Sequence, residues 1–134
     1  MGIHFSWYDE NAGIMLCEME GGWTEDEFWK AQDEMFEMVN QSSVPHADLI
    51  VVTNVDMKQS PLNFFSTINA ADKRATKMLG DRRGVAVLIG LNRSVQIFLN
   101  MFTRVYNPKQ IFTATNIEEA YNLILRYRAK EMAR

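Results

Sequence analysis

Leu49-Ile50-Val51-Val52 is the stretch of sequence that decides the fold. A strand with one face in water alternates apolar and polar residues, whereas an unbroken apolar run indicates a strand that is covered on both faces. A second run of this kind, Val85-Ala86-Val87-Leu88-Ile89, follows later in the chain. Strands buried on both faces are typically parallel strands joined by helices. The two runs therefore predict an α/β domain with a largely parallel sheet.

Helix signals lie on either side of the first run. Thr24, followed three residues later by Glu27, forms a capping box and predicts the start of one helix. Ser60 is a suitable N-cap for a second helix, because Pro61 is favoured at the first helical position. Gly80 is the natural end of that helix.

The chain continues with the same alternation. A third helix is expected from Asn92 or Ser94 to Val105, followed by a strand at Ile111–Ala114 and a fourth helix. The N-cap of the fourth helix is left open between two pairs, Asn116 with Glu119 and Thr115 with Glu118.

The chain opens with a predicted hairpin. Ile3, Phe5 and Trp7 alternate with more polar residues, the segment 9–13 is rich in turn formers, and Ile14–Met19 is a second strand. The resulting order is β-β-α-β-α-β-α-β-α. We expect residues 1–134 to form a single domain with a mixed, mostly parallel five-stranded sheet and four helices.

This order resembles the SpoIIAA-like fold of STAS domains (anti-sigma-factor antagonists and transporter tails) and, more distantly, Sec14/CRAL-TRIO lipid-binding domains. Three stretches carry the resemblance: the hairpin turn at 7–14, the strand 49–52 that leads through Asn54-Val55-Asp56 to a serine-capped helix, and the strand and Glu-rich helix start at 110–120. The resemblance implies that Ser60 matches a serine or threonine that a partner kinase phosphorylates in the antagonists. The family's Asp-Ser-Ser-Gly-like turn is Gln59-Ser60-Pro61-Leu62 here, without the acid before or the glycine after the serine, and we favour Ser60 as an N-cap, which explains it fully.

Composition excludes several classes of protein. The 134 residues are 47% hydrophobic and 23% charged, which is ordinary for a globular domain. Cys17 is the single cysteine, so no internal disulfide forms, and His4 and His46 are too few for a structural zinc site. No cofactor motif is present. The absence of a signal segment and of a long apolar run leads us to expect a cytoplasmic protein.

Charge is distributed unevenly along the chain. Residues 1–56 have a net charge of −11 and residues 57–134 one of +8. Either the two halves neutralise each other inside one domain, which we favour, or a basic face meets a partner or a second copy. A basic run contributes to this asymmetry and consists of Lys73, Arg74, Lys77, Arg82 and Arg83. Of these residues, we expect Lys73, Arg74 and Lys77 on the solvent side of the second helix. The pI of 5.4 and the lack of interleaved aromatics disfavour nucleic acid.

Candidates for catalysis are few. Ligands of open α/β sheets bind beyond the carboxyl ends of the strands. The residues expected there are Glu20, Asn54, Asp56, Gly90, Asn92, Arg93 and Thr115. Asp56 with Arg93 is the one acid–base pair among them. It lacks a histidine or a nucleophile, so we do not expect an enzyme.

Two function hypotheses remain. The first is a non-enzymatic, STAS-like regulatory or scaffolding module that binds a protein partner or a second copy of itself, through Phe65 on the second helix and Phe102 on the third. The second, resembling the Sec14 branch, is a small apolar-ligand or lipid-binding domain. It is suggested by the excess of Met and Phe and predicts a cavity lined by them.

Overall fold

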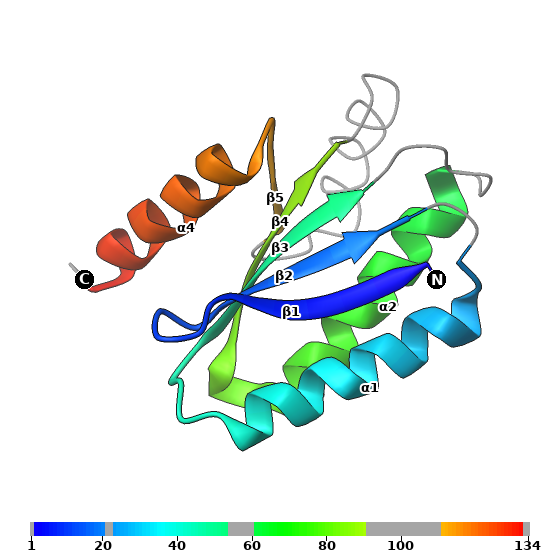
Figure 1. The fold of residues 1–134 in the computed structure, drawn as a ribbon, viewed down its shortest axis with the longest axis horizontal. Helices are drawn as coiled ribbons and strands as arrows, with labels where there is room; N and C mark the ends of the chain where they lie inside the picture. Colours follow the sequence, from blue (N-terminus) through cyan, green and yellow to red (C-terminus); the bar gives the residue numbers. More distant parts are fainter. Residues whose placement is uncertain (1, 21–22, 54–60, 91–110, 133–134) are drawn as a thin grey trace.

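The computed structural model describes residues 2–20, 23–53, 61–90 and 111–132 (Figure 1). Its elements are β1 (Ile3–Asp9), β2 (Ile14–Met19), α1 (Glu25–Gln41), β3 (Ala47–Thr53), α2 (Pro61–Leu79), a 3-10 turn η1 (Gly80–Arg82), β4 (Arg83–Ile89), β5 (Ile111–Ala114) and α4 (Ile117–Met132). All five predicted strands and three of the four predicted helices are confirmed. The predicted helix between Asn92 and Val105 lies outside the described residues.

The five strands form one sheet in the order β1-β2-β3-β4-β5. β1 is antiparallel to β2, and each later strand is parallel to the one before it. The apolar run in β3 lies at the centre, where Ile50 pairs with Leu16 of β2 on one side and with Val87 of β4 on the other. The mixed, mostly parallel sheet is as predicted.

Helices cover both faces of this sheet, with α1 and α2 on one face and α4 on the other (Figure 1). Successive strand residues therefore enter different cores. Val51 and Leu88 pack in the core under α1 and α2, whereas Ile50 and Val87 pack with Ile124 of α4. This arrangement explains why β3 and β4 are apolar without alternation.

Two of the predicted helix caps are also confirmed, and those at Ser60 and at Asn92 or Ser94 lie outside the described residues. The Thr24 hydroxyl accepts a hydrogen bond from the Glu27 N–H at 3.2 Å and so caps α1. At α4, the Asn116 side chain accepts from the Glu119 N–H at 2.8 Å, which decides between the two pairs left open. Gly80 has a φ of +57° directly after α2, a conformation that glycine adopts without strain.

The uneven charge is neutralised in part by ion pairs within the domain. Arg74 of α2 pairs with Asp33 of α1, and Arg128 of α4 pairs with Asp48 of β3, so two ion pairs join the basic part of the chain to the acidic part. Arg82 donates to the Val39 carbonyl at the end of α1, at 2.7 Å. Lys73 and Lys77 are exposed as expected, whereas Arg74 is only partly exposed because its guanidinium bonds Gln32 and Asp33 of α1.

Candidate functional site

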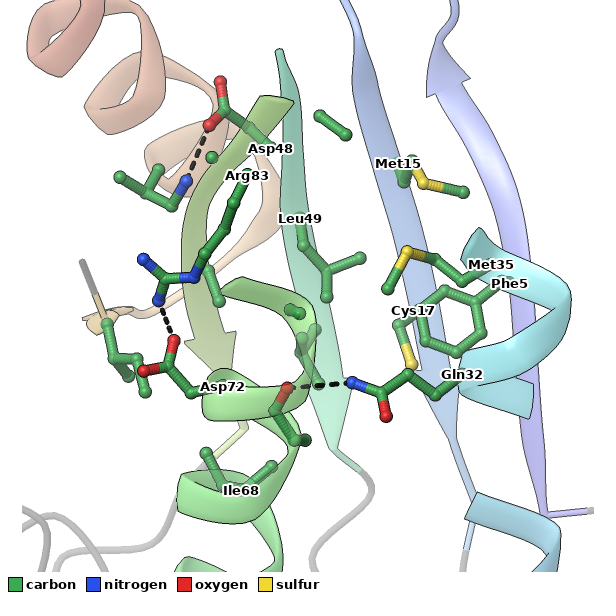
Figure 2. Close-up of a pocket in the computed structure, with 18 of the residues that line it drawn as sticks. Phe5, Met15, Cys17, Gln32, Met35, Asp48, Leu49, Ile68, Asp72 and Arg83 are labelled. Atoms are coloured by element: carbon green, nitrogen blue, oxygen red, sulfur yellow. Dashed lines mark hydrogen bonds and ion pairs between the residues drawn. The ribbon is translucent and has the colours of Figure 1, made fainter. Parts of the chain in front are cut away.

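An apolar cavity of about 100 Å³ lies between the sheet and helices α1 and α2 (Figure 2). Large sulfur-containing and aromatic side chains form much of its wall. They are Phe5 of β1, Met15, Cys17 and Met19 of β2, and Phe28 and Met35 of α1. Methionine is unbranched and flexible, so a wall of this kind adapts to the shape of what it contains.

The cavity exists because small residues face each other across the layers. Ala71 and Ala75 are four residues apart and lie on one face of α2. Ala86 of β4 also lines the cavity. None of these methyl groups fills the space between helix and sheet, whereas the side chains on β2 and α1 are long. Space therefore remains beneath α2.

Polar contacts join α1 to α2 beside the cavity. The Gln32 side chain is 4% exposed, and its Nε2 donates to the Ala71 carbonyl at 2.9 Å. Its Oε1 accepts from Arg74 Nη1 at 3.0 Å. The Arg74 guanidinium also lies over the rings of Trp29 and Phe36, 5.8 and 5.4 Å from their centroids. These contacts satisfy a buried amide and fix the two helices together.

An ion pair lies at another part of the cavity wall, between Arg83 of β4 and Asp72 of α2 (Figure 2). Both side chains are largely buried, with exposed fractions of 13% and 17%. Burial lowers the pKa of Arg83 from its ordinary value, because the charged form loses solvation. The nearby Tyr127 opposes that shift.

A bulge in β4 sets the position of this arginine. Ala47 of β3 pairs with Arg83 of β4. Leu49 lies two residues after Ala47, but its partner Ala86 lies three residues after Arg83. The extra residue in β4 changes the face of the sheet on which the Arg83 side chain lies. Gly84 lies inside the bulge, where a Cβ atom would collide with the Asp48 carboxylate and the Ala47 carbonyl.

A larger groove of about 590 Å³, lined by both polar and apolar groups, lies at the amino ends of β3 and β4. His46, Tyr127 and Arg128 are among the residues that line it. Three residues, Asp48, Arg83 and Gly84, line both the groove and the apolar cavity. The two hollows therefore meet at the start of β4.

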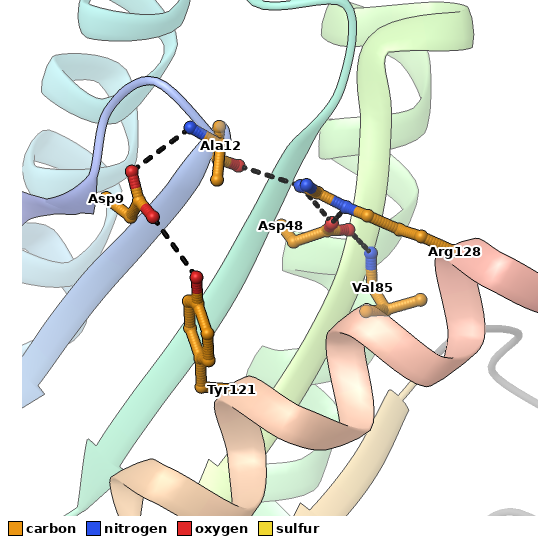
Figure 3. Close-up of polar contacts among 7 residues, drawn as sticks. Asp9, Ala12, Asp48, Val85, Tyr121 and Arg128 are labelled. Carbon is orange, nitrogen blue, oxygen red and sulfur yellow. Dashed lines mark hydrogen bonds and ion pairs between the residues drawn. The ribbon is translucent and has the colours of Figure 1, made fainter.

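Asp48 is the buried charge at this meeting point (Figure 3). Asp48 is 4% exposed, and its Oδ1 accepts a hydrogen bond from the Val85 N–H at 2.7 Å. Its Oδ2 accepts from Arg128 Nε at 2.6 Å. The carboxylate thus satisfies the backbone of the β4 bulge and anchors α4 to the sheet.

Cys17 lines the cavity as a free, buried thiol. Burial raises its pKa well above the ordinary value, and the neighbouring charge of Glu18 adds to the shift. The thiolate, which is the nucleophilic form, is therefore suppressed. The interpretation of Cys17 as an inert core residue is confirmed as far as its burial is concerned.

Five of the residues singled out from the sequence are not described by the structure. Asp56, Ser60, Arg93 and Phe102 fall outside the described residues, as does the side chain of Phe65. The residues that sequence reasoning missed are Gln32, Asp48, Asp72 and Arg128, whereas Arg83 was named only as part of the basic run. Only Asp48 left a signal, because a carboxylate directly before the buried run 49–52 needs a partner.

Comparison of the chain with protein-family models, with curated proteins and with solved structures finds no match. Within the described ranges, no three His, Cys, Asp or Glu side chains are grouped so that they could hold a metal ion. The helices in the same part of the chain include none with the length and apolarity needed to cross a bilayer.

Proposed function

We propose that this chain binds a small apolar ligand in the cavity between the sheet and helices α1 and α2. The observation that carries this proposal is the apolar cavity itself, with Met15, Met19 and Met35 in its wall. It corresponds to the second of the two hypotheses drawn from the sequence. The first, a protein-binding module, depends on residues outside the described ranges and stays a prediction.

An empty apolar cavity is costly in a domain of this size. Apolar space that no group fills forfeits dispersion contacts with the side chains that line it. Close packing is the rule in protein interiors, so a retained void favours a role in binding. An apolar ligand would restore the missing contacts and recover part of that free energy.

The volume of the cavity limits what it can hold. An engineered apolar cavity of about 150 Å³ binds benzene or xenon, so about 100 Å³ suits a group of roughly four carbon atoms. A whole lipid needs far more space, since pockets for drug-sized ligands measure ~300–1,000 Å³. We therefore narrow the sequence-based hypothesis from lipids in general to a small apolar molecule or a short apolar tail.

Xenon tests this proposal directly, because it binds apolar cavities without hydrogen bonds. We expect ¹²⁹Xe NMR to show a specific protein-dependent shift, and Ala71→Leu to weaken xenon binding by about tenfold by filling the cavity. Ala70→Leu is the matched control, since Ala70 is the exposed neighbour on the same helix. The absence of specific xenon binding, or equal binding by both variants, would contradict the proposal.

Should Ala71→Leu fail to fold, Ala75→Val fills the same cavity with a smaller addition.

A further inference from the structure

β1 leaves one edge of the sheet without a neighbouring strand. It is the first strand in the order β1-β2-β3-β4-β5, and β2 is its only partner among the described strands (Figure 1). The Gly2 carbonyl accepts a hydrogen bond from the Glu20 N–H at 2.7 Å, so these residues form a hydrogen-bonded pair of the antiparallel ladder. Such pairs alternate with non-hydrogen-bonded ones, so the N–H and C=O groups of Ile3, Phe5 and Trp7 point away from β2. In the described part of the chain, none of these backbone groups has a hydrogen-bond partner.

The devices that usually protect an edge strand are few in β1. Natural edge strands are commonly short, or carry a proline, a lysine or a bulge. β5, at the opposite edge, has only four residues, whereas β1 has seven and contains neither proline nor lysine. The irregularity in its pairing lies between Trp7 and Asp9, at the end of the strand. The stretch Ile3–Trp7 is therefore regular and long enough to pair with an added strand.

Apolar side chains follow the same edge. Ile3, Phe5 and Trp7 lie on the face of the sheet that α1 covers, and all three are only partly buried. His4 and Ser6 alternate with them on the other face. A strand added beside β1 would place every second side chain against this partly buried row. The row therefore favours a partner segment with apolar residues at alternate positions.

Carboxylates surround this edge. Two lie at the end of β1 and in the turn after it, and two lie on β2 or directly after it. Trp29 and Phe36 mark the flank of α1 that contacts Arg74 of α2. Glu27 and Glu34 project from the opposite flank, since positions 34 and 36 are about 200° apart around a helix. The six carboxylates are those of Asp9, Glu10, Glu18, Glu20, Glu27 and Glu34.

Cations near this edge are few. Lys30 is the only lysine or arginine between residues 2 and 41. Arg128 of α4 approaches the hairpin at the Gly13 carbonyl, but its charge is offset by Asp48. A second copy of this chain would bring the same carboxylates to the edge and would be repelled. The charge distribution instead favours a basic partner.

We propose that β1 is a docking edge for an extended basic segment of a partner protein. The segment adds a strand beside Ile3–Trp7, with apolar residues on the face covered by α1 and lysine or arginine on the opposite face. Backbone hydrogen bonds to Ile3, Phe5 and Trp7 supply affinity, and the surrounding carboxylates select the charge of the segment. Binding at this edge is a second function and does not depend on the ligand of the cavity.

Model peptides test the charge of the partner. We would titrate the heptapeptide Lys-Val-Lys-Val-Lys-Val-Lys, with blocked ends, into the ¹⁵N-labelled protein at low ionic strength and follow the amide signals by NMR. The expected result is that the largest shifts lie at Ile3, Phe5 and Trp7. We expect Glu-Val-Glu-Val-Glu-Val-Glu to bind about tenfold more weakly, because the carboxylates around β1 repel it. Equal affinities, or shifts confined to other elements, would overturn the inference.

Methylation of the peptide backbone tests the addition of a strand. Alternate N–H groups of a strand point to opposite sides, so methyl groups on the three valine nitrogens and on three of the lysine backbone nitrogens block different edges of the peptide. The two methylated peptides have the same charge and composition. One of them should bind about tenfold more weakly than the unmethylated peptide, and the other should keep its affinity. Equal affinity of the two would refute strand addition and leave only attraction between charges.

Variants of the protein test the site itself. Ser6→Lys places a positive charge in the middle of β1, on the face expected to receive basic side chains. We expect it to weaken binding of the lysine peptide about tenfold, whereas Ala70→Lys, at an exposed position of α2, should change nothing. Should Ser6→Lys fail to fold, Glu18→Lys reverses an exposed charge on the neighbouring strand. Unchanged affinity in the folded variant would contradict the proposal, and self-association in sedimentation that the variant abolishes would assign the edge to a second copy instead.

Discussion

Asp48 shows how much of the molecule depends on a single side chain. It is buried in the central strand, yet it accepts from the Val85 N–H and from Arg128, which lie 37 and 80 residues away in the sequence. One carboxylate thereby satisfies the backbone of a bulge and holds a helix on the sheet. A buried charge is tolerated because every partner is supplied by the fold.

Truncation of this residue should be severe. Asp48→Ala leaves the Val85 N–H and the Arg128 guanidinium without their acceptor, and we expect a loss of about 3–5 kcal/mol in the free energy of unfolding. Urea denaturation followed by circular dichroism measures it. Glu34→Ala, at an exposed position of α1, should stay within about 0.5 kcal/mol of the parent. A loss at position 48 as small as that of the control would show that the carboxylate is dispensable.

Among the elements, helices α1 and α2 are held together by Arg74. Its guanidinium bonds Gln32 and Asp33 and lies over two aromatic rings of α1. Asp33 is 60% exposed, so the ion pair itself contributes little. The larger contributions come from stacking on the rings and from satisfying the buried Gln32 amide.

Arg74→Met should therefore destabilise the protein by about 1–2 kcal/mol, and Arg74→Lys should not restore the loss. An ammonium group is a point charge, which cannot stack on the rings while also bonding Gln32 and Asp33. Lys73→Met, at the exposed neighbouring position, is the control and should be nearly neutral. If Arg74→Lys has the same thermal stability as the parent, charge alone matters at this contact between α1 and α2.

The elements were predictable where a local pattern determines them. The Thr24 and Asn116 caps, the glycine after α2 and the apolar run of β3 each depend on a few adjacent residues. The cavity was not predictable in detail, because its wall combines side chains from five strands and two helices. The bulge at Gly84 also changes the face that Arg83 enters, and no periodicity in the sequence marks it.

At the scale of the whole molecule, the buried thiol of Cys17 couples stability to pH. Its pKa is raised in the folded protein, so above about pH 8.5 the unfolded chain releases a proton that the folded chain keeps. The contribution of the protonated Cys17 thiol to the free energy of unfolding is fully present below that pH and is lost as the pH rises. Well above pH 8.5, we expect this group to lower the free energy of unfolding by about 1.4 kcal/mol per pH unit, and by about half that near pH 8.5.

Comparison of the parent with Cys17→Ala isolates this effect. The variant loses core packing at every pH, but its stability should decline less steeply between about pH 8.5 and pH 9.5. Tyr121, whose pKa is raised by its hydrogen bond to Asp9, titrates in both proteins and cancels from the difference. Parallel pH profiles in urea denaturation would show that the thiol is not the group responsible.

The strand order has a consequence for how the chain is synthesised. Among the five described strands, each is hydrogen-bonded to the strand that precedes it in the sequence, so none of them is inserted between two earlier ones. The sheet can grow by addition at one edge while the polypeptide leaves the ribosome from its N-terminus. The hairpin of β1 and β2 needs only a short loop closure to form, and it then offers β3 a finished edge. Biosynthesis and assembly thus run in the same direction along this chain.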